Sequence, residues 1–480
     1  MSAKMDEKKK KNTEEEGAKS VGKQKLRIMR NVIVVSFGFT LLFTAYQSMA
    51  SLQSSINSVD GLGTWSLSTI YAALVVSSMF LPTYLIKRFS VKWTMCASML
   101  CYSAYIAAQF YPEFYTLIPG GIILGLGAAP MWSAKCTYLT QIAMKYSELS
   151  RERTEAVIVR FFGIFFLFFQ SSSVFGNLIV AQVLGRGDED ANVTDDALAK
   201  CGINFCASEQ DDSDNENLDP PPKSRLYTLS TIYLISSFGA ALLIATLLDP
   251  LTKYGELDRT GPAKSNQPEG SSGLHHLLAT FRHMKHPFQL LVIPLTMWSG
   301  VEQGYFTSEF TRAYVSCAWG TPNIGYVMLC FGVVDALSSY CFGYVIKLVG
   351  RIPVFILGAA LNAGCIVTFY LWGPNPDEVY VFFVIAGVWG MADAIWQTQI
   401  NAFYGVLFPE SEEAAFSNYR LWESIGFILA YALNNLVCVR FHTTVVATVL
   451  GVGMAGYMII EVIHVTKKKQ YNVHNKKETT

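Results

Sequence analysis

The stretch AGVWGMADAIWQTQINAFYGVLF, residues Ala386–Phe408, is long and apolar enough to cross a membrane, yet it carries several polar side chains. Asp393, Gln397 and Asn401 follow one another at intervals of four residues, so they share one face of a helix. A polar group in hydrocarbon is costly unless it faces protein or water. The stretch therefore predicts a membrane-spanning helix with one face turned towards other helices or a water-accessible space.

The composition of the chain is typical of a membrane protein. Of its 480 residues, 51% are hydrophobic and 15% are charged, whereas about a quarter are charged in soluble domains. Lysine and arginine flank the apolar segments instead of forming a basic domain, so we expect no nucleic-acid partner. The sequence shows no nucleophile–base motif and no zinc-site spacing, so we expect no enzymatic activity, no cofactor and no metal site.

Twelve apolar runs reach the length of about 20 residues that a bilayer core requires. They lie near residues 31–53, 67–86, 93–112, 115–139, 157–184, 226–248, 288–310, 322–346, 352–372, 379–408, 416–438 and 443–465. Most joints between them are short, and the long joint 249–287 divides them into two sets of six. We therefore predict an all-α multi-pass membrane protein with an N-terminal tail (1–30), an N-terminal half (31–248), a linker (249–287), a C-terminal half (288–465) and a C-terminal tail (466–480).

The distribution of positive charge predicts the orientation. If the N-terminus is cytosolic, the tails and even-numbered loops hold 28 of the 37 lysine and arginine residues, and the opposite loops hold six. Because positively charged loops remain on the cytosolic side, both termini are predicted to be cytosolic. The linker segment Gly273–His286 carries its leucines on one helical face, which predicts an amphipathic helix at the cytosolic membrane surface.

The long loop 185–225 then lies outside the cytosol. It contains Asn192-Val193-Thr194, the one N-x-S/T sequon of the sequence, so Asn192 is predicted to carry a glycan. It also contains Cys201 and Cys206, which are separated by four residues. In an oxidising compartment these two cysteines either form a small disulfide with each other or remain as spare thiols in an acidic loop.

The two sets of six spans resemble each other weakly at matching positions. Tyr84–Lys87 at the end of the second span matches Tyr344–Lys347 at the end of the eighth, and Arg160 opens the fifth span as Arg420 opens the eleventh. Two parallel six-helix halves joined by a long cytosolic loop are typical of the major facilitator superfamily, whose binding site lies between the halves at mid-membrane. The repeat therefore predicts this fold.

Polar residues within the spans predict what lines the centre of such a fold. The candidate set consists of Glu302, Asp335, Asp393, Gln397, Asn401, Arg420 and Glu423. Glu302, Asp335 and Asp393 either take up a proton or a cation during a transport cycle or make structural hydrogen bonds and ion pairs. Arg420 and Glu423, three residues apart, form either a local ion pair or a clamp for a substrate.

Five segments together resemble the Unc-93 family. They are FGFTLLFTAYQSMASLQSSI (Phe37–Ile56), GLGAAPMWSAKCTYLT (Gly125–Thr140), FFGIFFLFFQSSSVFGNL (Phe161–Leu178), VWGMADAIWQTQINAFYGVLF (Val388–Phe408) and AAFSNYRLWESIGF (Ala414–Phe427). The resemblance covers residues 31–465 and implies a twelve-span, major-facilitator-like protein of the plasma membrane. It also implies a regulatory or accessory subunit of a membrane protein such as a potassium channel. Transport of a small solute, coupled to protons or cations, is the alternative function.

One loop motif differs from that of the transporters in the superfamily, which usually carry G-x-x-x-D-R/K-x-G-R/K between spans 2 and 3 and again between spans 8 and 9. The first copy here, Pro82–Lys92, lacks both glycines and the acid. The second copy keeps Gly343, Gly350 and Arg351 but has Lys347 in place of the acid. Loss of the acid removes the usual cytosolic gating contact, which favours the regulator over the transporter.

Asn192→Gln should abolish N-glycosylation, because it removes the one sequon of a loop that the charge distribution places outside the cytosol. Glycosidase treatment of protein expressed in human cells should increase the gel mobility of the wild type and leave that of the variant unchanged. Equal mobility of treated and untreated wild type would contradict the predicted topology.

Overall fold

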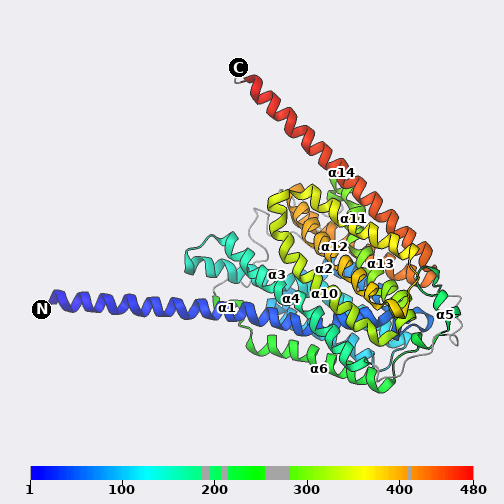
Figure 1. Ribbon diagram of the computed structural model, residues 1–480. Coiled ribbons are helices and arrows are strands. Elements are labelled where there is room, and N and C mark those ends of the chain that lie inside the picture. Colours follow the sequence, from blue (N-terminus) through cyan, green and yellow to red (C-terminus); the bar gives the residue numbers. More distant parts are fainter. Residues whose placement is uncertain (1, 186–193, 207–214, 255–281, 409–411, 479–480) are drawn as a thin grey trace.

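The structure is a computed structural model that describes residues 2–185, 194–206, 215–254, 282–408 and 412–478. The described residues form helices joined by turns, and no strand occurs among them. The long helices pack side by side in one bundle, and the first and last helices extend beyond it (Figure 1). The predicted glycan site Asn192, and residues 273–281 of the predicted amphipathic helix, lie outside the described residues.

The N-terminal half contains five long helices, which are α1 (Ser2–Ile56), α2 (Leu62–Ala108), α3 (Phe114–Ser150), α4 (Thr154–Leu184) and α6 (Lys223–Leu247). Helix α2 covers both the second and the third predicted span, and the backbone breaks sharply between them at Ser90. Between α4 and α6 lie the short elements α5 (Asp195–Ala199), η2 (Gly202–Asn204) and η3 (Glu216–Leu218). Two further turns are η1 (Val59–Gly61) and η4 (Leu251–Tyr254).

The C-terminal half begins with α8 (Pro287–Tyr305), which continues as the π-helical segment η6 (Phe306–Ser316) and ends in α9 (Cys317–Trp319). After the turn η7 (Thr321–Asn323) it contains α10 (Ile324–Val349), α11 (Arg351–Leu371), the turn η8 (Pro376–Glu378), α12 (Val379–Leu407), α13 (Glu412–Leu436) and α14 (Val439–Glu478). Every predicted span therefore lies largely on helical segments, although several helices extend beyond the predicted ends.

Not every helix is apolar enough to identify a span by itself. Within the described residues, nine helices are long and apolar enough to cross a membrane. Helix α8, helix α13 and the second part of α2 are not among these nine. Helices α8 and α13 carry polar residues of the candidate site, and these residues lower the mean hydropathy of the two helices. The count of twelve spans stays a prediction.

The two halves contact each other in a reciprocal pattern. Helix α2, which holds the second span of the first half, packs on α13, the fifth long helix of the second half. In return, α4, the fifth predicted span, packs on α10. The rings of Tyr71 and Phe427 stack across the first of these contacts, with 4.1 Å between their centroids. Two similar halves that are related by a pseudo-two-fold axis produce such a pair of equivalent contacts.

The internal repeat also appears in the backbone. Ser90 has φ 68° and ψ 163°, and Gly350 has φ 82° and ψ 174°. These residues lie three positions after Lys87 and Lys347, the ends of the two matching segments in the sequence. Glycine adopts this conformation readily, whereas a residue with a Cβ atom is strained there by about 1–3 kcal/mol. The first half therefore keeps a strained serine at the position that the second half fills with glycine.

Ser90→Gly should stabilise the protein, because glycine removes this backbone strain, whereas Gly350→Ala should destabilise it. We expect changes of about 1 kcal/mol in opposite directions. Thermal unfolding of the purified protein in detergent measures both, and Gly451→Ala serves as the control, because a Cβ atom on Gly451 meets no atom within 4 Å. A lower unfolding temperature for Ser90→Gly would contradict the strain argument.

Candidate functional site

Three buried acids from three helices meet in the C-terminal half. Glu302 comes from α8, Asp335 from α10 and Asp393 from α12, and their exposed fractions are 0%, 7% and 5%. Asp335 and Asp393 both lie close enough to Glu302 to interact with it electrostatically. The structure therefore brings together the three acids that the sequence predicts at the centre of the fold.

Glu302 and Asp393 form the tightest part of this acidic cluster. Oε2 of Glu302 accepts a hydrogen bond of 2.7 Å from the indole nitrogen of Trp389. Oε1 of Glu302 is buried and has no hydrogen-bond donor among the described residues, although Asp393 is its neighbour. Two neighbouring ionised carboxylates repel each other in a medium of low polarity. A proton or a cation held between them would remove the repulsion and give Oε1 a partner.

Asp335 connects the two halves. Its Oδ2 atom accepts a hydrogen bond of 2.9 Å from Nε2 of Gln170, which comes from α4 of the N-terminal half. Its Oδ1 atom accepts a longer hydrogen bond of 3.4 Å from Ser339, one turn along α10. Sequence reasoning predicted Asp335 but missed Gln170, which lies 165 residues away in the chain.

A chain of hydrogen bonds leads from Asp393 to α13. Nε2 of Gln397 lies 3.2 Å from Oδ1 of Asp393 and 3.2 Å from the hydroxyl oxygen of Ser299. Ser299 donates to Oε1 of Glu423 over 3.2 Å. The polar face that the spacing of Asp393 and Gln397 predicts is therefore bonded to α8 and, through it, to α13.

Arg420 and Glu423 form the local ion pair that the sequence left as one of two possibilities. Nη1 of Arg420 lies 2.6 Å from Oε2 of Glu423. Glu423 also accepts a hydrogen bond of 3.0 Å from the hydroxyl of Tyr419, and Asn401 donates to the same hydroxyl over 3.5 Å. The Arg420 side chain is 59% exposed although it faces the other half of the protein, where Lys135 of α3 is close enough for the two charges to interact.

Lys135 is a buried cation of the N-terminal half. Its exposed fraction is 2%, and its amine lies between 4.3 and 5.3 Å from the ring centroids of Trp132, Phe162, Phe165 and Phe166. Aromatic rings attract a cation through their negative faces, and the attraction increases when water is excluded. Within the described part of the chain, Lys135 forms no ion pair, so the rings are its main electrostatic support.

Two disulfides hold the described residues between α4 and α6 against the C-terminal half, and they overturn both alternatives for Cys201 and Cys206, a disulfide with each other and spare thiols. Cys201 is bonded to Cys317 in α9, and Cys206 is bonded to Cys438 in the turn between α13 and α14. The turn η2 separates Cys201 from Cys206 and directs each towards a different edge of the C-terminal half. Both alternatives were wrong because they considered the loop alone and no partner for its cysteines outside it.

Hydrogen bonds reinforce this attachment. We call residues 194–206 and 215–222 the outer segment. The side-chain amides of Asn215 and Asn217 donate to the carbonyl oxygen of Cys317 over 3.0 and 3.3 Å. The backbone N–H of Val439 donates to the carbonyl oxygen of Phe205 over 3.0 Å. Because the outer segment begins and ends on helices of the N-terminal half, it ties the two halves together at this end of the bundle.

Hydrogen bonds and carboxyl groups from several helices make up the site. In the ranges that the structure describes, no three His, Cys, Asp or Glu side chains lie close enough together to hold a metal ion. A separate buried pair, Nδ1 of His442 and Oε1 of Glu309 at 2.8 Å, joins α14 to η6. The site is therefore a polar network between helices.

Comparison with known proteins identifies the family. The sequence profile described as "Ion channel regulatory protein UNC-93" matches residues 53–458. The chain belongs to the UNC-93 family. It is 46% identical to protein unc-93 homolog A of Xenopus laevis, over 92% of this chain and 95% of that protein. It is also 44% identical to the human homolog A, over 91% of this chain and 94% of that protein.

A more distant relative has a functional name. The "Putative potassium channel regulatory protein unc-93" of Caenorhabditis elegans is 34% identical over 96% of this chain and 64% of that protein. Among solved structures, the nucleoside transporter NupG aligns with a TM-score of 0.58 at 13% identity, over 89% of this chain and 98% of that one. The structure of tetrameric PepTSo2 aligns with a TM-score of 0.57 at 12% identity, over 92% of this chain and 99% of that one. These likenesses confirm that this UNC-93 family protein has the predicted major facilitator fold.

Non-reducing peptide mapping of this UNC-93 family protein should recover the links Cys201–Cys317 and Cys206–Cys438. Cys317→Ser should leave one link intact and release one thiol for labelling, because the two bonds occupy different edges of the C-terminal half. Cys365→Ser, which removes a free buried cysteine, is the matched control. A peptide in which Cys201 is linked to Cys206 would overturn the assignment.

Proposed function

We propose that this UNC-93 family protein is a non-enzymatic regulatory or accessory subunit of another membrane protein, such as a potassium channel. The observation that carries the proposal is the covalent tie between the two halves at the outer segment. A transporter of this fold opens its central site to each side in turn by moving one half against the other. Two disulfides and the hydrogen bonds around them restrain that movement at one end, which suits a scaffold better than a transporter.

The family names support the same interpretation. The profile that matches most of the chain describes an ion channel regulatory protein, and the C. elegans relative is named for potassium channel regulation. The cytosolic loop motif also differs from that of transporters, with Lys347 where an acid is usual. For the location, we infer the plasma membrane with both termini in the cytosol, because lysine and arginine gather at that side and disulfides form on the other.

We infer that the partner docks on the outer face shared by α11 and α14, which pack against each other. Small residues are exposed on both helices, namely Ala360 and Gly364 on α11 and Gly451 and Ala455 on α14. A Cβ atom on Gly364 or Gly451 would meet no atom within 4 Å. Small residues on a membrane-spanning helix let another helix approach closely, which is the main source of helix association in lipid.

The acidic cluster favours a second candidate function, secondary transport of a small solute coupled to protons or cations. Buried carboxyl groups inside membrane-spanning helices commonly mark ion or proton pathways. Here Asp335 reaches across to Gln170 of the other half, so a change in its protonation would alter a contact between the halves. Asp335 is therefore the residue whose substitution separates the two functions.

Co-expression with a two-pore-domain potassium channel, at matched surface levels, should distinguish them. If the protein changes the channel current by docking through α11 and α14, Gly451→Leu should reduce that change in current severalfold. Leucine would fill the space that a partner helix would occupy. Gly239→Leu in α6, which also projects into open space, is the matched control and should have little effect. Asp335→Asn should likewise change the channel current as much as the wild-type protein does.

The opposite result would favour transport. Loss of the effect on current with Asp335→Asn, together with no effect of Gly451→Leu, would overturn the regulator proposal. Solute uptake into proteoliposomes that is lost with Asp335→Asn would then support the acidic cluster as the coupling site.

A further inference from the structure

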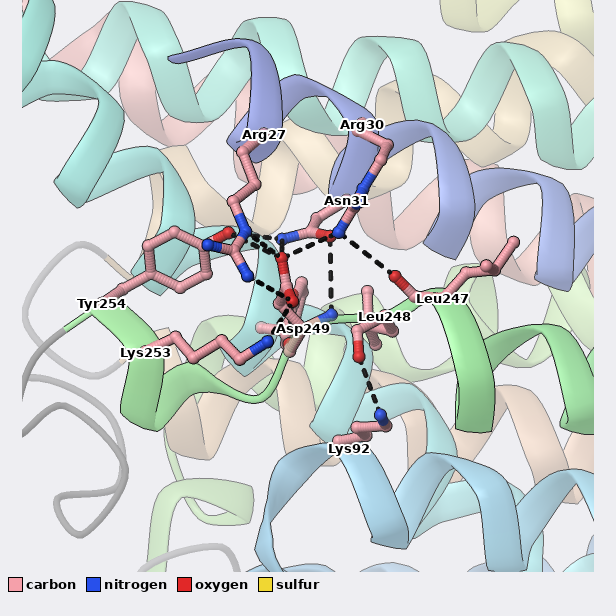
Figure 2. Close-up of polar contacts among 10 residues, drawn as sticks. Arg27, Arg30, Asn31, Lys92, Leu247, Leu248, Asp249, Lys253 and Tyr254 are labelled. Atoms are coloured by element: carbon pink, nitrogen blue, oxygen red, sulfur yellow. Dashed lines mark hydrogen bonds and ion pairs between the residues drawn. The ribbon is translucent and has the colours of Figure 1, made fainter. Parts of the chain in front are cut away.

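A compact group of cations lies where α1 meets the end of α6 (Figure 2). Nε of Arg27, Nη2 of Arg30 and Nζ of Lys253 lie 2.7, 2.8 and 2.8 Å from the carboxylate oxygens of Asp249. The amine of a fourth cation, Lys92 of α2, donates to the backbone carbonyl oxygen of Leu248 over 2.8 Å. We call these four cations and Asp249 the basic cluster. It contains four positive charges and one negative charge.

The carboxylate gathers these cations without neutralising them. The Asp249 side chain is 7% exposed, whereas the side chains of Arg27, Arg30 and Lys253 are 45%, 54% and 48% exposed. Asn31 and Tyr254 also donate to Asp249, so its acceptor capacity is used inside the protein. Among the described residues, Nε and Nη1 of Arg30 make no hydrogen bond. Donors of the cluster are therefore available to an external anion.

An exposed tryptophan beside the basic cluster indicates the level at which we expect lipid headgroups to meet the protein. Lys92 is followed by Trp93, which is 54% exposed, and the Lys92 amine lies 5.4 Å from the centroid of its ring. Exposed tryptophan prefers the interface between the hydrocarbon and the water. On the orientation that the distribution of lysine and arginine predicts, this is the cytosolic leaflet, which carries the anionic lipids of a cell membrane.

Exposed apolar side chains continue from the cluster into the membrane region. On α1, Leu26, Ile33 and Phe37 are 73%, 39% and 44% exposed, and they share one helical face with Arg30. On the neighbouring α6, Leu247, Leu242 and Phe238 are 53%, 64% and 49% exposed. The two helices are in direct contact, because the Ser236 hydroxyl donates to the Leu41 carbonyl oxygen over 2.8 Å.

We propose that the basic cluster binds an anionic phospholipid of the cytosolic leaflet whose headgroup carries phosphomonoester groups, with its acyl chains along the exposed faces of α1 and α6. Planar guanidinium groups match phosphate oxygens in geometry, and several clustered cations suit a headgroup with several charges. The lipid would join the first and last helices of the N-terminal half at their cytosolic ends. This inference is independent of the proposed channel partner.

Native mass spectrometry of the purified full-length protein tests the proposal with short-chain lipids. Dioctanoyl phosphatidylinositol 4,5-bisphosphate should bind at least about tenfold more tightly than dioctanoyl phosphatidylcholine. Arg30→Gln should weaken phosphoinositide binding by about fivefold, and Arg30→Gln with Lys253→Gln by about 25-fold, since each cation contributes about 1 kcal/mol. Asp249 keeps Arg27 as a partner in both variants, and Lys253→Gln alone provides a second route if Arg30→Gln does not fold.

Lys145→Gln is the matched control, because it removes one positive charge at the same end of the bundle from a residue paired with Glu148. It should change the affinity less than about twofold. Equal losses with Lys145→Gln and Arg30→Gln would overturn the proposal, as would equal binding of the phosphoinositide and phosphatidylcholine.

A soluble anion separates a lipid site from a phosphate site. Inositol trisphosphate should bind more weakly than the lipid, because it lacks acyl chains to contact Ile33 and Phe37. Phe37→Ala should weaken lipid binding severalfold and leave inositol trisphosphate binding unchanged. Equal affinity for the lipid and for inositol trisphosphate would show that the cluster takes a free phosphate and that the lipid assignment is wrong.

Discussion

An ionisable side chain inside a membrane-spanning bundle needs polar neighbours, and this constraint determines how the centre of the protein is built. The C-terminal half meets it with hydrogen bonds. Glu302 has the indole of Trp389, Asp335 has Gln170, and Asp393 has Gln397. The N-terminal half meets the same constraint by surrounding the amine of Lys135 with aromatic rings. The buried acids therefore collect in the C-terminal half, where Arg420 pairs with Glu423, and the buried cation Lys135 lies in the N-terminal half.

The two ends of the bundle are held by different chemistry. At the outer segment, disulfides and the amides of Asn215 and Asn217 fix the N-terminal half to the C-terminal half. At the other end, Asp249 holds cations of α1 and of η4 together within the N-terminal half. The first attachment is covalent and joins the halves, whereas the second is ionic and exposed to water. Among the described residues, the disulfides between the halves lie at the outer segment, so they restrain relative movement of the halves most strongly at that end.

The sequence predicts features whose cause is local and misses those that depend on distant partners. Apolar length and polar spacing are properties of one helix, which explains why the predicted spans lie on helical segments and why Glu302, Asp335 and Asp393 could be singled out from the sequence. The bond between Gln170 and Asp335 joins residues on different helices, and no periodicity indicates it. The true partners of Cys201 and Cys206 also lie far along the chain, 116 and 232 residues away. The predicted spans place all four of these cysteines at the same end of the bundle, and this shared position is the one signal that would have suggested Cys317 and Cys438.

Ser90 shows a different kind of limit. Its segment matches the one around Gly350, so the repeat predicts an equivalent bend, but serine by itself gives no sign of a left-handed conformation. Only the glycine in the second copy reveals what the backbone requires in the first. An internal repeat can therefore supply conformational information that the residue type conceals.

The disulfide connectivity has a consequence for biosynthesis. The partner of Cys201 lies 116 residues later in the chain, and the partner of Cys206 lies 232 residues later. During membrane insertion, both thiols emerge before the helices that bring Cys317 and Cys438 to the same side. Cys201 can pair once α9 has brought Cys317 to the same side, whereas Cys206 stays unpaired until α13 has been inserted and Cys438 follows it. The Cys206–Cys438 bond can therefore form only after almost the entire chain has been inserted in the correct orientation. A chain that ends early, or whose later helices insert in the wrong orientation, keeps Cys206 as a free thiol.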